Sequence, residues 1–70
     1  MIIQLLTDEM IPDGTLPCEM TGGRQFLEMG IEEFIDKMAE RGWQLGFELG
    51  NVYEFENAGG ELVEFFIEVE

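Results

Sequence analysis

Residues 60–70 read GELVEFFIEVE, and this alternating stretch decides how we expect the chain to fold. One set of alternate positions is apolar, and the other is acidic except for one phenylalanine. A period of two is typical of a strand with one buried and one exposed face. The sequence therefore predicts a sheet with an apolar inner face and a negative outer face. The apolar set is Val63, Phe65, Ile67 and Val69, and the other is Glu64, Phe66, Glu68 and Glu70.

The preceding segment, residues 43–56 (WQLGFELGNVYEFE), also alternates and has a turn signal at Gly50 and Asn51. A two-residue loop there would pair Leu49 with Val52 and place glutamates among the aromatic side chains. We therefore expect a three-residue loop or a bulged hairpin, or else one long bent strand. Each of these keeps the aromatic residues on a single face.

The connection into the last strand, around residues 57–60, is constrained in the same way. A loop with an odd number of residues brings Phe55 opposite Val63, whereas a two-residue turn brings it opposite Glu64. We expect a loop of three or five residues.

Residues 30–41 (GIEEFIDKMAER) form the clearest helical pattern in the chain. Their apolar side chains recur at the spacing of one helix face. Gly30 is an acceptable N-cap, Gly42 is placed to end the helix, and Trp43 is placed to pack back onto its last turn. The apolar positions are Ile31, Phe34, Ile35 and Met38.

The N-terminal part is less regular. Residues 2–6 (IIQLL) predict a short buried strand, with Ile3 and Leu5 on one face and Gln4 on the other. Residues 7–23 predict a long loop, and residues 24–29 suit either a short strand or an extended entry to the helix. The expected fold is one α+β domain covering residues 1–70. In it, one helix packs on a mainly antiparallel sheet of three or four strands, in the order strand, loop, helix, strand, strand, strand.

Charge gives the main lead toward function. The chain carries a net charge of −13, with only three lysine and arginine residues against 16 aspartate and glutamate residues. Such a surface repels phosphates, which opposes direct binding to nucleic acid or to anionic membranes. It favours a cationic partner, and we expect that partner to be the basic surface of another protein.

Catalytic and metal chemistry find little support in the residue types. The chain has no histidine, and Cys18 is its single cysteine. Neither a Cys–His dyad nor an internal disulfide can form, and the neighbouring Glu19 would raise the pKa of the Cys18 thiol rather than activate it. We expect a protein that is not an enzyme and has no cofactor or metal.

The start of the chain shows no basic segment followed by an apolar signal core, and no apolar run approaches about 20 residues. We expect a cytoplasmic protein, in the host cytoplasm if the source is viral.

The acidic strand faces suggest a specific role. Carboxylates two residues apart on a strand are separated by about 6.6–6.8 Å. A grid of them presents a potential like that of a nucleic-acid backbone. The hypothesis is an inhibitor of the DNA-mimic, anti-restriction or anti-CRISPR type, which occupies the nucleic-acid-binding surface of its partner. The expected contact residues are Glu48, Glu54, Glu56, Glu64, Phe66, Glu68 and Glu70, with Glu32, Asp36 and Glu40 as a second patch.

Phe66 leaves an alternative open. An aromatic residue among glutamates resembles an interface anchor with a polar rim. The alternative is a homodimeric structural or accessory subunit whose contacts involve Phe66 and the loop at residues 10–20, and whose acidic surface only gives solubility.

Overall fold

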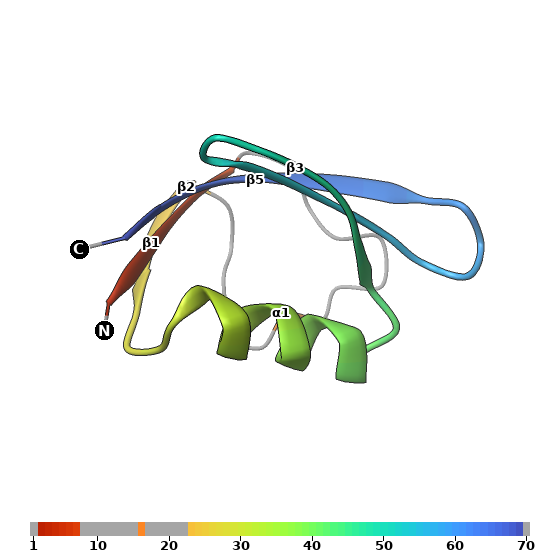
Figure 1. Ribbon diagram of the computed structural model, residues 1–70, viewed down its shortest axis with the longest axis horizontal. Helices are drawn as coiled ribbons and strands as arrows, with labels where there is room; N and C mark the ends of the chain where they lie inside the picture. Colours follow the sequence, from red (N-terminus) through yellow and green to blue (C-terminus); the bar gives the residue numbers. More distant parts are fainter. Residues whose placement is uncertain (1, 8–15, 17–22, 70) are drawn as a thin grey trace.

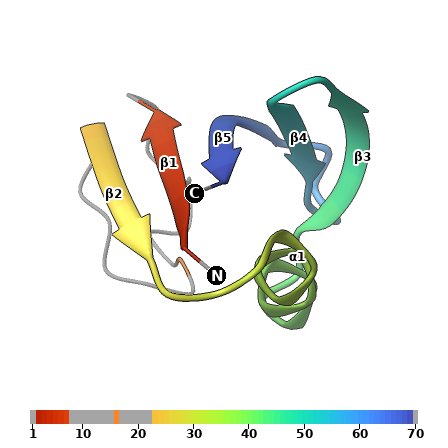
Figure 2. The same ribbon diagram turned by 60° about the vertical axis from the view of Figure 1, so that its left-hand side comes forward.

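A computed structural model describes residues 2–7, 16 and 23–69 of the 70-residue chain. These residues form one antiparallel sheet in the order β2-β1-β5-β4-β3 and one helix, α1. The sheet is strongly curved, and α1 lies against its concave side (Figures 1 and 2). The elements are β1 (Ile3–Thr7), β2 (Gly23–Leu27), α1 (Ile31–Glu40), β3 (Gln44–Leu49), β4 (Val52–Glu56) and β5 (Leu62–Val69).

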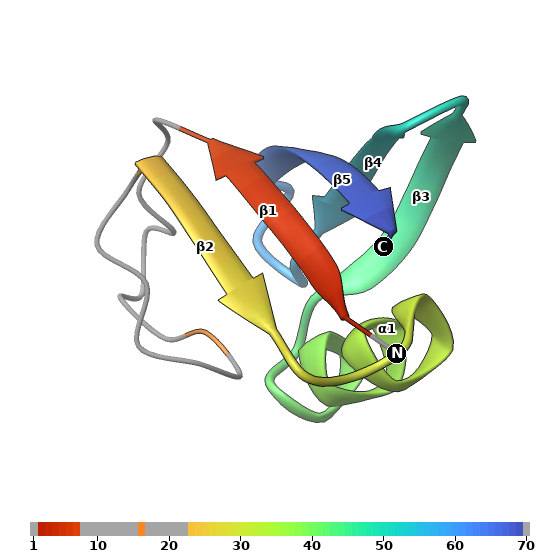
Figure 3. The ribbon, with the colours of Figure 1, turned by 90° about the vertical axis from the view of Figure 1, so that its left-hand side faces the viewer.

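The α+β class predicted from the sequence is confirmed, but the predicted number of strands is wrong. The described residues form five strands, because Gly23–Leu27 is a strand that pairs with β1 along its whole length. Figure 3 shows the two strands side by side. The pairing sets Leu27 opposite Ile3, and both side chains are buried. The predicted loop over residues 7–23 lies almost entirely outside the described residues.

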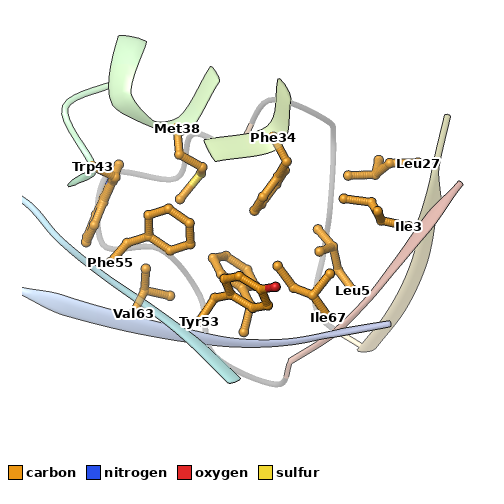
Figure 4. Close-up of a cluster of buried hydrophobic side chains, with 11 residues drawn as sticks. Ile3, Leu5, Leu27, Phe34, Met38, Trp43, Tyr53, Phe55, Val63 and Ile67 are labelled. Carbon is orange, nitrogen blue, oxygen red and sulfur yellow. The ribbon is translucent and has the colours of Figure 1, made fainter. Parts of the chain in front are cut away.

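The core fills the space between α1 and the concave face of the sheet (Figure 4). Its centre is a group of three phenylalanines, one from α1 and two from the sheet. The ring of Phe34 meets those of Phe55 and Phe65 edge to face, with centroid distances of 6.0 and 5.7 Å, and the two sheet rings lie 5.9 Å apart. Edge-to-face geometry sets the positive ring edge against the negative ring face. Phe34 therefore fixes the helix on the sheet by shape and by ring electrostatics together.

The ends of α1 agree with the sequence prediction. Gly30 is the N-cap, and Gly42 adopts a φ of 89° just after the helix. The Trp43 N–H donates to the Met38 carbonyl and the Gly42 N–H to the Ala39 carbonyl, both at 3.0 Å. This pair of bonds is the Schellman motif, which needs a left-handed residue where Gly42 stands. It places the fully buried Trp43 beside the end of the helix, where it continues the core into β3.

The β4–β5 connection has the predicted odd length. Glu56 pairs with Leu62, so five residues form the loop, and Phe55 lies opposite Val63 as expected. Within the loop, Asn57 Oδ1 accepts hydrogen bonds from the N–H groups of Gly59, at 3.0 Å, and Glu61, at 2.9 Å. An asparagine side chain that bonds the backbone two residues ahead is a common way to close a turn.

No helix formed by residues 2–7, 16 and 23–69 is long and apolar enough to cross a bilayer.

The aromatic contact predicts a large effect of one substitution. Replacing Phe34 with alanine should lower the free energy of unfolding by about 3–5 kcal/mol. That is comparable with all that a core of this size supplies, so Phe34→Ala should be largely unfolded by circular dichroism. The matched control is Phe47→Ala, which removes the same atoms from a half-exposed site. It should cost less than about 1 kcal/mol. Equal losses in denaturant titrations of the two variants would contradict the central role of Phe34.

Candidate functional site

The candidate site is the outer face of the sheet, defined here as the convex face turned away from α1 (Figure 1). Residues directly opposite each other in antiparallel strands point to the same face, so the register assigns each side chain. Among the described residues, five of the six exposed large hydrophobic side chains belong to this face. It is therefore more apolar than the sequence pattern predicted, which placed Phe66 as one aromatic residue on an otherwise acidic face. The five are Phe26, Phe47, Leu49, Leu62 and Phe66.

A β-bulge at Gly46 decides how β3 contributes. Leu45 lies opposite Phe55 on the inner face, but the register then shifts, and Phe47 lies opposite Glu54. A bulge is present, as one of the expected alternatives had it, but the two-residue turn that pairs Leu49 with Val52, which the sequence pattern argued against, is the turn that forms. The prediction that all aromatic residues of this hairpin face inward is wrong, because Phe47 lies beyond the bulge. The bulge reverses the alternation for the second half of the strand.

The prediction that Glu48 lies on the outer face is wrong for the same reason. It lies opposite Tyr53, a core residue, and not on the outer face with Glu54. Glu48 is exposed because β3 is an edge strand. The signal was present in the sequence, since an isolated glycine such as Gly46 in an alternating stretch suggests a bulge.

Four of the predicted carboxylates do share the outer face. Glu54 and Glu64 are direct partners in neighbouring strands, which brings their Cβ atoms to about 4.5–5.5 Å. Glu56 pairs with Leu62 along the same two strands, and Glu68 lies opposite Gln4 of β1. The structure thus brings together one close pair and two more separated carboxylates. Glu70 lies outside the described residues.

Between these carboxylates runs an apolar row that crosses four strands. Leu49, Val52, Phe66 and Leu6 are successive partners in β3, β4, β5 and β1. Leu49 is 69% exposed and Phe66 is 41% exposed, while Val52 and Leu6 are half-buried. Phe66, the predicted anchor, thus has apolar neighbours on both adjacent strands. Sequence alone showed only the glutamates next to it along its own strand.

The second predicted patch lies on the opposite side of the molecule. Glu32, Asp36 and Glu40 are exposed and follow one another at the four-residue spacing of a helix face. The buried side chains of α1, Phe34 and Met38, face the sheet, so these carboxylates point away from it (Figure 4). The two acidic patches cannot contact one flat partner surface together.

The acidity of Tyr53 depends on its surroundings in the fold. Burial raises the pKa of its phenol, and the negative charge of Glu48 raises that pKa further. Both effects disfavour the phenolate. This coupling agrees with the register, which sets the two residues on the same face.

Metal binding has no visible basis in the described residues, because no three Asp, Glu or Cys side chains there are grouped to hold an ion. No family model, no curated protein sequence and no solved structure matches this chain. Its function has to be argued from the outer face itself.

The bulge sets Glu48 opposite Tyr53, so the pKa of Tyr53 should depend on the charge of Glu48. Tyr53 is the only tyrosine of the chain, so its titration can be followed by absorbance. The absorbance of its phenolate should appear above the ordinary pKa, and Glu48→Gln should lower the midpoint without restoring the ordinary value. Because the folded state has the higher pKa, its stabilising contribution is complete below the unfolded pKa and is lost as pH rises through the folded one. Stability should therefore fall in the alkaline range. Glu54→Gln, on the opposite face, is the control, and an equal shift in both variants would exclude the assigned register.

Proposed function

We propose that this protein is a non-enzymatic binding module that occupies the basic, nucleic-acid-binding surface of another protein, as an anti-restriction or anti-CRISPR inhibitor does. The observation that carries the proposal is the outer face, where Glu54 and Glu56 of β4 lie beside Glu64 and Glu68 of the directly paired strand β5. A rigid sheet presents these charges in a fixed arrangement, which favours specific pairing with lysine and arginine side chains.

The net charge of −13 supports the same proposal. A strongly negative molecule is attracted to a basic surface over distances of a Debye length, about 8–10 Å in physiological salt. This attraction speeds encounter and discourages binding to acidic proteins, nucleic acid and anionic membranes. The proposed place of action is the cytoplasm, where nucleic-acid-binding proteins are accessible.

A second candidate function is a homodimeric structural or accessory subunit whose acidic surface only gives solubility. The exposed apolar row favours it, because exposed apolar patches mark interaction sites. Sedimentation at high salt tests it, since screening then permits like-charged chains to associate. A wild-type dimer that dissociates in Phe66→Glu with the fold retained would establish this candidate.

Two triple variants test the charge proposal. Each removes three negative charges, one variant from the outer face and the other from the opposite side of the molecule. One is Glu54→Gln, Glu64→Gln and Glu68→Gln on the outer face, and the other is Glu32→Gln, Asp36→Asn and Glu40→Gln on α1. Partners captured from a lysate at low salt are eluted in a salt series. The outer-face variant should release them at clearly lower salt than wild type, and the helix variant should behave nearly as wild type.

Two outcomes count against the proposal. Equal effects of the two triple variants would mean that only net charge matters and that the outer face is not the site. Elution independent of salt would mean that the carboxylates do not carry the binding. In the supportive case, added nucleic acid should compete with the protein for the captured partner.

A further inference from the structure

The apolar row is long enough to contact more than one side chain of a partner. Neighbouring strands lie about 4.8 Å apart, so the four residues from Leu49 to Leu6 extend over roughly 14 Å. Phe66 is in the middle of the row, with Val52 on one side and Leu6 on the other. Large side chains at the centre of a patch are those that most often dominate binding energy.

Carboxylates border the row along β5 on both sides. Glu64 precedes Phe66 by two residues and Glu68 follows it by two, so each lies about 6.6–6.8 Å away along the strand. Glu54, the direct partner of Glu64, extends the acidic border onto β4. The apolar row thus has carboxylates beside it along β4 and β5, while Phe47, Leu62 and Phe26 lie elsewhere on the outer face. Apolar side chains flanked by charged ones are typical of a protein interface.

The charge of the flanking carboxylates selects the occupant. A second copy of this chain would bring another −13 charges and set carboxylates against carboxylates. A purely apolar partner would leave the charge of Glu68 without compensation, and a purely basic one would leave Phe66 and Leu49 without contacts. The complementary surface has lysine or arginine around exposed aromatic or aliphatic side chains.

That combination is the chemistry of surfaces that bind single-stranded nucleic acid, where aromatic side chains stack on bases between basic groups that hold the phosphates. Surfaces that bind duplex backbones rely on basic and polar groups instead. We propose that the outer face binds a single-stranded-nucleic-acid-binding surface, with the apolar row against its aromatic side chains and the flanking carboxylates against its lysine and arginine residues. This inference rests on the proposed function and specifies which kind of basic surface the protein occupies.

Two synthetic peptides of equal length and equal lysine content test it, one with tryptophan between the lysines and one with serine. The dissociation constant of each is measured by fluorescence anisotropy at low salt. The wild-type protein should bind the tryptophan peptide about tenfold more tightly or better, as expected for a central aromatic contact. The double variant Leu49→Thr, Phe66→Thr should lose that preference and keep the affinity for the serine peptide.

A matched control is Leu62→Thr, which removes another exposed apolar side chain from the same face, four residues or about 13 Å from Phe66 along β5. It should keep the preference for the tryptophan peptide. Threonine retains strand propensity in all three substitutions, and circular dichroism checks that each variant is folded.

Each failure has a distinct meaning. Equal binding of the two peptides by wild type, or a preference that survives in the double variant, would overturn the role of the apolar row and leave the acidic-inhibitor proposal standing. No binding of either peptide would overturn both. A wild-type dimer that forms under the conditions of the binding assay and hides the row from the tryptophan peptide would overturn the inference in favour of self-association.

Discussion

The edge-to-face contact of Phe34 with Phe55 and Phe65 is the interaction on which the rest of the structure depends. The helix buries only Phe34 and Met38 in full, while Ile31 and Ile35 pack against the core and remain partly exposed. A chain of about this length buries only roughly 60% of the surface that it exposes when unfolded. Its single cysteine allows no internal disulfide. Concentrating the large rings on the concave face is what allows so small a domain to have a core.

The sequence predicted the elements whose signals are local. The apolar spacing of residues 30–41 and the glycines at either end defined the helix, because backbone conformation there depends on neighbouring residues. The loop before β5 was also predictable, since only an odd length sets Phe55 against Val63. Both conclusions follow from constraints that a short stretch of chain carries by itself.

Two features required the pairing of distant residues. Residues 24–29 have no clear period, so the sequence left a short strand and an extended entry to the helix both open, and the pairing with β1 decides between them. The Gly46 bulge shifts the register of β3, so the parity argument that placed Glu48 among the outward carboxylates fails beyond that residue. The composition of the candidate site is affected most, because the bulge exchanges a predicted glutamate for Phe47 and Leu49. Four predicted carboxylates and Phe66 share the outer face, while the helix patch is a separate surface.

The position of β5 in the sheet has a consequence for biosynthesis. β1 pairs with β2 and β3 pairs with β4, and among the described strands β5, which follows the other four in the sequence, joins these two hairpins. On the ribosome, the nascent chain can form each hairpin but cannot close the sheet until residues 62–69 have emerged. The apolar faces of both hairpins stay accessible to chaperones and proteases during that interval. A variant that lacks residues 62–69 would therefore lose the strand that joins the two hairpins in the described sheet.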